Sequence, residues 1–411
     1  MMKQNEHIAK LSSGYLFPEI AKRRRAFASA HPDARIISLG IGNTTEPLTP
    51  HICTAMAQYA QALGTKSGYS GYGDDSAGVM ELRDKIAQVL YNGAVSAGEV
   101  YISDGAKCDV GRIQQLFGSG VTAVVQDPAY PVYVDGSVMT GAAGGARVDG
   151  SGYEGVVYMP CTAENQFFPS DLSVIPENAL IYFCSPNNPT GAVASKAQLA
   201  ALVAAARAKK SVIIFDAAYA AYIRDPSLPR SIFEIDGARE CAIEINSFSK
   251  PIGFTGVRLG WTVVPKELTY EDGSSVARSW ERLTNTIFNG ASNIAQQGGL
   301  ASLSAEGQKE TRALTDYYLA NARRIREALS QSNFSAAGVE VYGGDNAPYV
   351  WVRFPGRKSW DIFDRLLCEC HVVCTPGAGF GPAGESYIRF SAFGHQEDVA
   401  EACGRLARFS V

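Results

Sequence analysis

The chain has 411 residues, of which 46% are apolar and 19% are charged, and its formal net charge is −4. That length is too great for one small core, and the composition excludes wholesale disorder. The small excess of acid gives no general attraction to nucleic acid or to an anionic membrane. The sequence contains neither an apolar run of eighteen residues nor an apolar signal core near residue 1, so we expect a cytoplasmic protein.

Nine cysteines in such a chain are expected to be reduced thiols rather than a disulfide framework. The densest group is Cys368, Cys370 and Cys374, beside His371. Zinc sites usually show paired CxxC-type spacing, and a second cluster is missing here. We therefore predict no metal site.

The N-terminal part of the chain indicates an arm followed by a glycine-containing strand end. Residues 1–35 predict an arm with a helix near 17–29, and a helix is expected at 50–63. Between them, ISLGIG lacks the third glycine of a dinucleotide-binding fingerprint. Gly42 is instead expected to let backbone approach a ligand.

From about residue 50 to 290, apolar strands alternate with helices, which predicts a mostly parallel sheet covered on both faces. Beyond residue 290 we expect one long helical stretch over 291–331 and then an α+β lobe. That lobe has strands near 338–342, 349–354 and 387–392 and a helix near 360–370. The predicted division is 1–47 for the arm and part of a small domain, 48–295 for a large domain, and 296–411 for the rest of the small domain.

Lys250 follows a predicted buried strand, AIEINSFS, and enters a glycine-rich loop. Burial there lowers the pKa of a lysine and makes it nucleophilic. The hydroxyls of Ser247 and Ser249, with Arg258 eight residues beyond the lysine, suit a dianionic phosphate. This pattern favours a Schiff base to a phosphorylated aldehyde, pyridoxal 5′-phosphate. Taken alone, the lysine is more simply explained as a surface residue beside a turn.

Further polar positions follow the carboxyl ends of other predicted strands. Asp216 would keep the pyridinium nitrogen of this cofactor protonated, and Tyr219 and Asn188 would hydrogen-bond its phenolic oxygen. Tyr130 would stack on the ring. The free amides of a helix that starts near Ala106 would bind phosphate. Each position alone has an ordinary structural explanation, but the ordered set favours the cofactor.

The chain contains SPNNPTG, DAAY and SFSK in this order, and an arginine follows the lysine of SFSK by eight residues. This set of motifs resembles that of the fold-type I pyridoxal-phosphate-dependent aminotransferases. The segments SSGYLFPEIAKR, SLGIGNTTEPL, GYSGYG, ISDGAKCD, QDPAYPVYVD and SFSKPIGFTGVRLGW resemble the LL-diaminopimelate aminotransferases within them, over essentially the whole chain. The resemblance implies a large α/β domain and a smaller α+β domain formed from both termini. It also implies homodimers with shared active sites that interconvert LL-diaminopimelate plus 2-oxoglutarate and tetrahydrodipicolinate plus glutamate.

The resemblance also assigns roles to individual residues. Lys250, Asp216 and Tyr219 are the implied catalytic residues. Implied cofactor contacts are Tyr72 (reaching the phosphate from the partner subunit), Ala106, Lys107, Tyr130, Asn188, Asp216, Tyr219, Ser247, Ser249, Lys250 and Arg258. Implied substrate contacts are Tyr15, Gly42, Asp75, Lys107, Tyr130, Asn188, Asn289 and Arg389. Arg389 would clamp the α-carboxylate, although a charge at a strand end has the same sequence pattern.

One position departs from the family pattern. Asp75 stands where the family usually has a glutamate, contributed by the partner subunit to meet the distal ammonium of the substrate. Aspartate keeps the charge but is one methylene shorter, which leaves open an enzyme of the same fold acting on lysine or an aromatic amino acid.

Two other classes of protein fit the sequence less well. A cofactor-binding regulator would need a DNA-binding helix-turn-helix domain, and residues 1–35 are too few to hold one. A catalytically inactive scaffold would be expected to lose the lysine or the aspartate, and both are present.

Overall fold

The computed structural model describes residues 2–11, 16–40, 42–73 and 76–411. Its centre is a seven-stranded sheet in which β8 is antiparallel to both neighbours and the other adjacent pairs are parallel. The spatial order is β2 (Val100–Ser103), β8 (Gly260–Val263), β7 (Ala242–Ser247), β6 (Val212–Asp216), β5 (Ala179–Cys184), β3 (Thr122–Asp127) and β4 (Val156–Pro160). The predicted mostly parallel sheet is confirmed.

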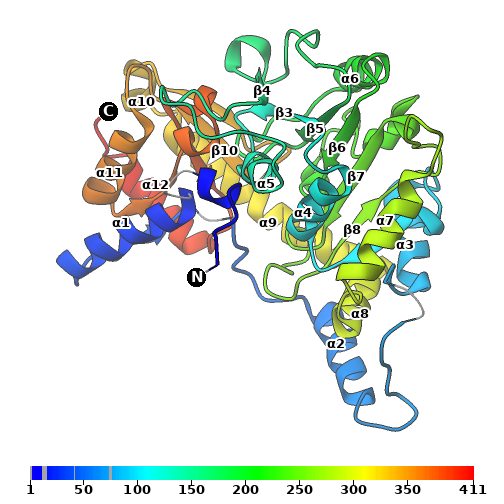
Figure 1. Ribbon diagram of the computed structural model, residues 1–411. Coiled ribbons are helices and arrows are strands. Elements are labelled where there is room, and N and C mark those ends of the chain that lie inside the picture. Colours follow the sequence, from blue (N-terminus) through cyan, green and yellow to red (C-terminus); the bar gives the residue numbers. More distant parts are fainter. Residues whose placement is uncertain (1, 12–15, 41, 74–75) are drawn as a thin grey trace.

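Helices cover both faces of this sheet (Figure 1), because its strands are apolar on both sides. In β5, for example, Ile181 and Phe183 pack into one core, while Leu180 and Tyr182 pack into the other. The first core is completed by α2 (Pro50–Ala62), α3 (Met80–Tyr91), α6 (Lys196–Ala208) and α8 (Asn293–Ser302). The second is completed by α4 (Ala106–Phe117), α5 (Val132–Met139), α7 (Val276–Ile287) and the first half of α9 (Ala305–Leu329).

A third core lies in a second lobe, where residues 16–39 pack with residues 322–409 (Figure 1). Its antiparallel sheet has the order β12 (Thr375–Pro376), β13 (Tyr387–Ser391), β10 (Tyr349–Arg353) and β9 (Glu340–Gly343). A short parallel pair joins β1 (Ile37–Ser38) to β11 (Val372–Val373). The helices of this lobe are α1 (Leu16–Ala30), α10 (Ser332–Ala336), α11 (Ser359–Cys370) and α12 (Gln396–Leu406).

The helical stretch expected over 291–331 is not one helix. It breaks after Leu303, because Ser304 caps a new helix by accepting a hydrogen bond from the Gly307 N–H at 3.1 Å. The second helix, α9, then joins the lobes. Leu314 and Tyr318 pack into a core of the large sheet, and Ile325 and Leu329 pack into the core of the second lobe.

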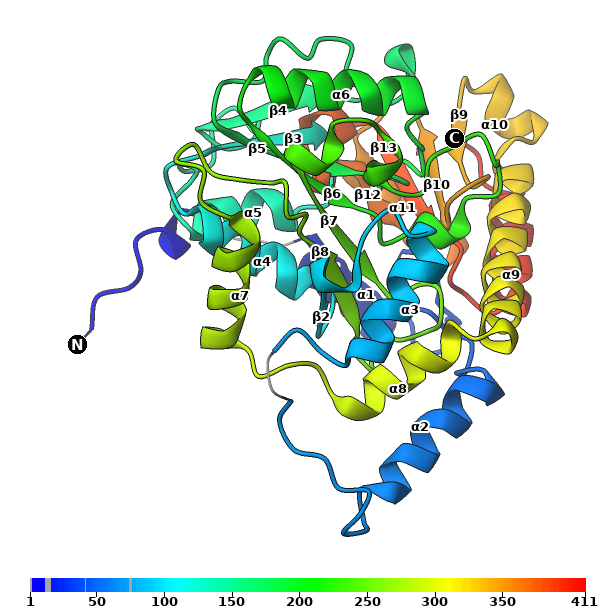
Figure 2. The same cartoon turned by 90° about the vertical axis from the view of Figure 1, so that its right-hand side faces the viewer.

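Helix α2 and the loop that follows it project from the body of the molecule in both overall views (Figures 1 and 2). Tyr69 and Tyr72, in this loop, are 72% and 85% exposed. Large aromatic side chains so exposed are typical of surfaces that meet another molecule.

All nine cysteines are free thiols. In the described part of the chain, His, Cys, Asp and Glu side chains do not gather into any group of three that could hold a metal ion. Among the same residues, none of the helices is both long and apolar enough to cross a membrane.

Candidate active site

A cavity of about 560 Å³ lies at the carboxyl ends of β5, β6 and β7, between the two lobes. Twelve residues predicted for the site from the sequence line it together. They are Gly42, Ala106, Lys107, Tyr130, Asn188, Asp216, Tyr219, Ser247, Ser249, Lys250, Arg258 and Arg389. Carboxyl ends of strands in an open α/β sheet are where ligands bind, and here strand-end motifs far apart in sequence meet.

Lys250 is half-buried and lies three residues beyond the end of β7. Desolvation and, to a lesser extent, the positive charges of Arg389 and Arg258 together lower its pKa from the ordinary 10.5 to about 7. Its Nζ donates a hydrogen bond to the carbonyl oxygen of Gly42. A β-carbon at position 42 would lie 3.6 Å from that Nζ, so the glycine lets backbone come close to the amine. Near neutral pH, a large share of this amine is uncharged and nucleophilic.

Asp216 ends β6, and its carboxylate is held from two sides. Oδ2 accepts a hydrogen bond from the Tyr133 hydroxyl at 2.7 Å, and Oδ1 accepts one from the Ala218 N–H at 3.0 Å. Burial raises its pKa despite these two hydrogen bonds. A buried carboxylate without a cationic partner is costly, so a cationic ring nitrogen is a fitting ligand for it.

A phosphate-sized cradle lies where α4 begins. Gly105 caps this helix without a side chain, so the first amides face the cavity uncapped. A β-carbon at Gly105 would lie 2.1 Å from an Arg258 Nη, which shows how closely the arginine approaches this backbone. Arg258 also donates to the Ser249 hydroxyl at 3.1 Å. Serine, arginine and helix amides together suit a dianion.

Arg389 is only 1% exposed, yet it has no acidic partner among the described residues. Its two Nη atoms donate to Asn188 Oδ1 at 2.7 Å and to the Gly40 carbonyl at 2.6 Å. Its buried Nε–H lacks a partner in the described chain. Burying a guanidinium without a carboxylate partner costs free energy. The planar fork of N–H donors matches the two oxygens of a carboxylate ligand.

The charges of the cavity fit pyridoxal 5′-phosphate and an amino acid. Among its described lining residues, Lys107, Lys250, Arg258 and Arg389 are cationic and Asp216 is the only acid. The phosphate and the substrate carboxylate together supply the negative charge that this excess of cations requires. The residues present therefore fit the cofactor.

Two tyrosines of the cavity were missed by the sequence analysis. Tyr133 bonds Asp216, and Tyr349 lies 2.7 Å from the Tyr219 hydroxyl, oxygen to oxygen. Tyr133 follows Tyr130 by three residues, on α5, and Tyr349 stands at the start of an apolar strand. A tyrosine in such a strand has the pattern of a core residue, so only the fold identifies it.

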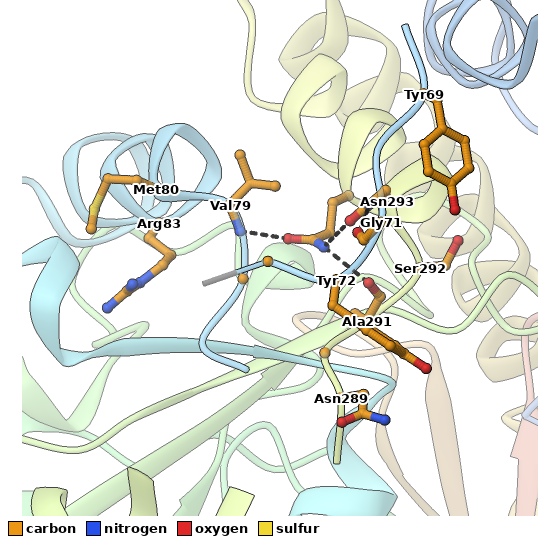
Figure 3. Close-up of a pocket in the computed structure, with 14 residues that line it drawn as sticks. Tyr69, Gly71, Tyr72, Val79, Met80, Arg83, Asn289, Ala291, Ser292 and Asn293 are labelled. Carbon is orange, nitrogen blue, oxygen red and sulfur yellow. Dashed lines mark hydrogen bonds between the residues drawn. The ribbon is translucent and has the colours of Figure 1, made fainter. Parts of the chain in front are cut away.

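Tyr72 and Asn289 do not join the Lys250 cavity. Both are exposed and line a different pocket, shown in Figure 3. Gln296 fixes one wall of that pocket by accepting from the Val79 N–H at 2.8 Å and donating to the Ala291 carbonyl at 3.0 Å. The predicted substrate contacts Tyr15 and Asp75 lie outside the described residues.

A mixed α/β sheet with a half-buried lysine of lowered pKa, a phosphate cradle and a carboxylate-binding arginine defines a pyridoxal-phosphate-dependent transferase. The family model for aminotransferases of class I and II matches residues 34–406. The chain is 51% identical over 406 residues to the LL-diaminopimelate aminotransferase of Protochlamydia amoebophila, which covers 99% of this chain and 97% of that relative. It is 52% identical to the chloroplastic LL-diaminopimelate aminotransferase of Arabidopsis thaliana, over 98% of this chain and 86% of that one.

A solved structure agrees with these relatives. The LL-diaminopimelate aminotransferase of Chlamydomonas reinhardtii superposes with a TM-score of 0.93 at 53% identity, covering 98% of each chain. The chain belongs to the class I and II aminotransferases and, within them, to the family of LL-diaminopimelate aminotransferases. It is an aminotransferase whose cofactor is pyridoxal 5′-phosphate.

Proposed function

We propose that this enzyme interconverts LL-2,6-diaminopimelate plus 2-oxoglutarate and tetrahydrodipicolinate plus glutamate, in the biosynthesis of diaminopimelate and lysine. The observation that carries the proposal is the buried Arg389, which has no acidic partner among the described residues and lies in the same cavity as the low-pKa Lys250. The relatives named above, at 51–53% identity, support this choice of substrate.

Different residues of the site would hold different parts of the cofactor and the substrate. Ser247, Ser249, Arg258 and the first amides of α4 would hold the cofactor phosphate. Asp216 would pair with the ring nitrogen. Bound in this way, pyridoxal 5′-phosphate supplies an electron sink for the charge that develops when the substrate Cα loses its proton.

Arg389 would orient the substrate by binding its α-carboxylate with two N–H groups. Asn188 supports that arginine through its Oδ1, at 2.7 Å, so its own amide N–H groups remain as donors toward the cofactor. Tyr130 would cover the ring, and Lys107, 5.7 Å from the centre of the Tyr130 ring, would meet a distal carboxylate. Gly42 would contribute backbone close to the reacting carbon.

Lys250 would carry the proton. Because its pKa is about 7, its amine can accept the proton from Cα and release it at C4′ of the cofactor without a large free-energy cost in either direction. Two such half-reactions, the first with an amino donor and the second with a keto acceptor, give a ping-pong cycle.

We also propose that the enzyme is a homodimer with shared sites and that its domains divide at 47/48 and 295/296. Tyr72 and Asn289 line a pocket separate from Lys250 and are exposed, as expected if they reach the site of a partner subunit. Asp75 would meet the distal ammonium of the substrate. Location in the cytoplasm stays a prediction from the sequence.

The test of the proposed function is a transamination assay of the purified protein with each amino donor and 2-oxoglutarate. Turnover with LL-diaminopimelate, and little with lysine or phenylalanine, is expected. Faster turnover with lysine or phenylalanine would contradict the proposed substrate and leave the aminotransferase class intact.

A further inference from the structure

Tyr349 lies between the two parts of the site that handle substrate and cofactor. It begins β10 in the second lobe, is only 1% exposed, and lines the Lys250 cavity. Its hydroxyl oxygen is 2.7 Å from the hydroxyl oxygen of Tyr219, which follows β6 of the large sheet. One buried hydrogen bond thus joins the lobes inside the site.

The ring of Tyr349 contacts the carboxylate-binding arginine. The Arg389 guanidinium carbon lies 4.4 Å from the ring centre, within the range of a cation–π interaction. The two residues sit on adjacent strands, where Tyr349 is opposite Ser391 and Trp351 is opposite Arg389. The ring therefore forms one wall of the pocket that orients the guanidinium.

The hydroxyl of Tyr349 also reaches the backbone beside Lys250. A β-carbon at Gly42 would lie 2.7 Å from this hydroxyl, and the Gly42 carbonyl accepts a hydrogen bond from Lys250. Glycine at position 42 therefore leaves room for the tyrosine as well as for the lysine.

We propose that Tyr349 is a positioning residue that couples Arg389 to Tyr219, through its ring on one side and its hydroxyl on the other. This inference rests on the proposed function, in which Tyr219 contacts the phenolic oxygen of the cofactor. The Tyr219 hydroxyl has one proton, and donating it to the cofactor leaves its oxygen as an acceptor. Tyr349 is then the donor in the bond between them.

A hydrogen bond received by Tyr219 makes Tyr219 a stronger donor, because chains of hydrogen bonds polarise one another. A stronger donor to the phenolic oxygen withdraws negative charge from the cofactor and lowers the pKa of its protonated linkage to Lys250. Several titratable or charged groups face the tyrosine pair from the surrounding elements: Cys184, Asp216, Tyr222, Lys250 and Arg389.

The experiment is a pH titration of the visible absorption of the cofactor-loaded protein, comparing the wild type with Y349F. Y349F keeps the ring and removes the donor. Its absorption pKa should rise by about 0.5–1 unit, the effect of losing one ordinary hydrogen bond. The kcat should fall about three- to tenfold for the same reason, and KM for the amino donor should stay within about twofold.

Two further variants separate coupling from a purely structural role. Y349L also removes the ring beneath Arg389, so KM should rise about 2- to 30-fold, the range of a cation–π contact. The double variant Y219F/Y349F should titrate like Y219F alone, because Tyr349 acts through Tyr219. The control is Y387F, a buried tyrosine of β13 that stacks on Trp351 at 4.9 Å and does not line the cavity; it should titrate like the wild type.

A normal wild-type band with an unshifted Y349F, or additive shifts in the double variant, would overturn the coupling and leave the proposed function standing. A wild type without any visible band after incubation with pyridoxal 5′-phosphate would overturn both. Because Y349F only removes the hydroxyl group, its titration tests the coupling between Tyr349 and Tyr219 even if Y349L does not fold.

Discussion

At the scale of single residues, the chemistry of this enzyme depends on burying charges whose partners arrive with the ligands. Arg389 is buried and Lys250 is half-buried, and neither forms an ion pair with a described residue. As a result, the pKa of the lysine falls. The arginine cannot deprotonate, so it is held by oxygen and π-electron partners until a carboxylate binds.

Replacing Lys250 with alanine should abolish turnover while leaving phosphate-mediated cofactor binding. We expect kcat to fall by about 10²–10⁴-fold or more, since the proton carrier is lost. Steady-state kinetics and cofactor retention after gel filtration measure the two effects. K85A, an exposed lysine of α3, is the matched control and should behave as the wild type. Near-normal turnover of K250A would refute the assigned role.

The acidity of Lys250 can be measured without cofactor. A small amine-specific electrophile should modify Lys250 of the apoprotein at a rate that rises with pH and levels off above about 7, because burial lowers its pKa to that value. The amine of a short lysine-containing model peptide, labelled in parallel, should keep gaining reactivity toward pH 10, the range of an ordinary lysine. Mass spectrometry after timed labelling follows Lys250 and the model peptide separately. A Lys250 curve parallel to that of the model peptide would exclude the lowered pKa.

The sequence predicted the residues that follow strand ends, and it missed those that contact them from the side. Asp216 and Lys250 stand where an apolar run stops, so their chemistry is visible in the sequence. Tyr133 and Tyr349 look like ordinary aromatic residues of a helix and a strand. Their roles depend on contacts 83 and 130 residues away, which only the tertiary structure supplies.

At the scale of elements, the phosphate cradle depends on the glycine that begins α4. G105A should weaken cofactor binding by at least about tenfold, because a β-carbon would lie 2.1 Å from an Nη of Arg258 and φ is +124°. G118A is a matched control on the same helix, since Gly118 also has positive φ (+67°) and open space around it. It should cost about 1–2 kcal/mol of stability without changing cofactor affinity.

Titrating the apoprotein variants with pyridoxal 5′-phosphate, followed by absorbance, gives both dissociation constants, and thermal unfolding gives the stabilities. Equal loss of affinity in G105A and G118A would indicate general strain rather than a displaced Arg258.

Asp127, at the end of β3, ties the large sheet to the second lobe. Both of its carboxylate oxygens lie 3.1 Å from the Ala383 N–H, and burial raises its pKa to about 7. Because the folded-state pKa exceeds the unfolded value, the stabilising contribution is present below pH 4 and is lost as the pH rises towards 7. Relative to D127N, the wild type should therefore lose stability between pH 4 and pH 7. Chemical denaturation at several pH values measures this, and a constant difference would contradict it.

Helix limits were well predicted where a cap or a proline marks them, and poorly where a helix is interrupted. Pro50 marks the start of α2, as expected. The break at Ser304 is hard to predict because residues 305–313, AEGQKETRA, are rich in helix-favouring alanine, glutamate, glutamine and lysine. The Ser304 cap separates α8 from α9 only because the two helices pack against different neighbours in the folded protein.

At the scale of the whole molecule, the proposed homodimer with shared sites makes a prediction about mixed dimers. K250A and Y72A should each be nearly inactive, yet mixing them should restore part of the activity. A hybrid dimer has one site with both defects and one with neither, provided that Tyr72 serves the partner's site. Refolding the two variants together and assaying the mixture tests this, with each variant refolded alone as the control. A mixture as inactive as its components would place Tyr72 and Lys250 in one subunit's site.

The overall architecture was predictable because alternating strands and helices leave few arrangements, and strand-end motifs then converge at one edge of the sheet. Tyr72 and Asn289 are both exposed. The family resemblance implied a role in the partner's site for Tyr72 but not for Asn289. An exposed polar residue carries little information about which subunit it serves.

The most direct test of the central claim is a donor comparison with 2-oxoglutarate as acceptor, recorded together with the visible spectrum. The donors are LL-diaminopimelate, meso-diaminopimelate, lysine, aspartate and phenylalanine. A cofactor band with turnover confined to the LL isomer is the predicted result. The same band with preferred turnover of lysine or phenylalanine would contradict the proposed substrate, and a protein with no band would contradict the cofactor site itself.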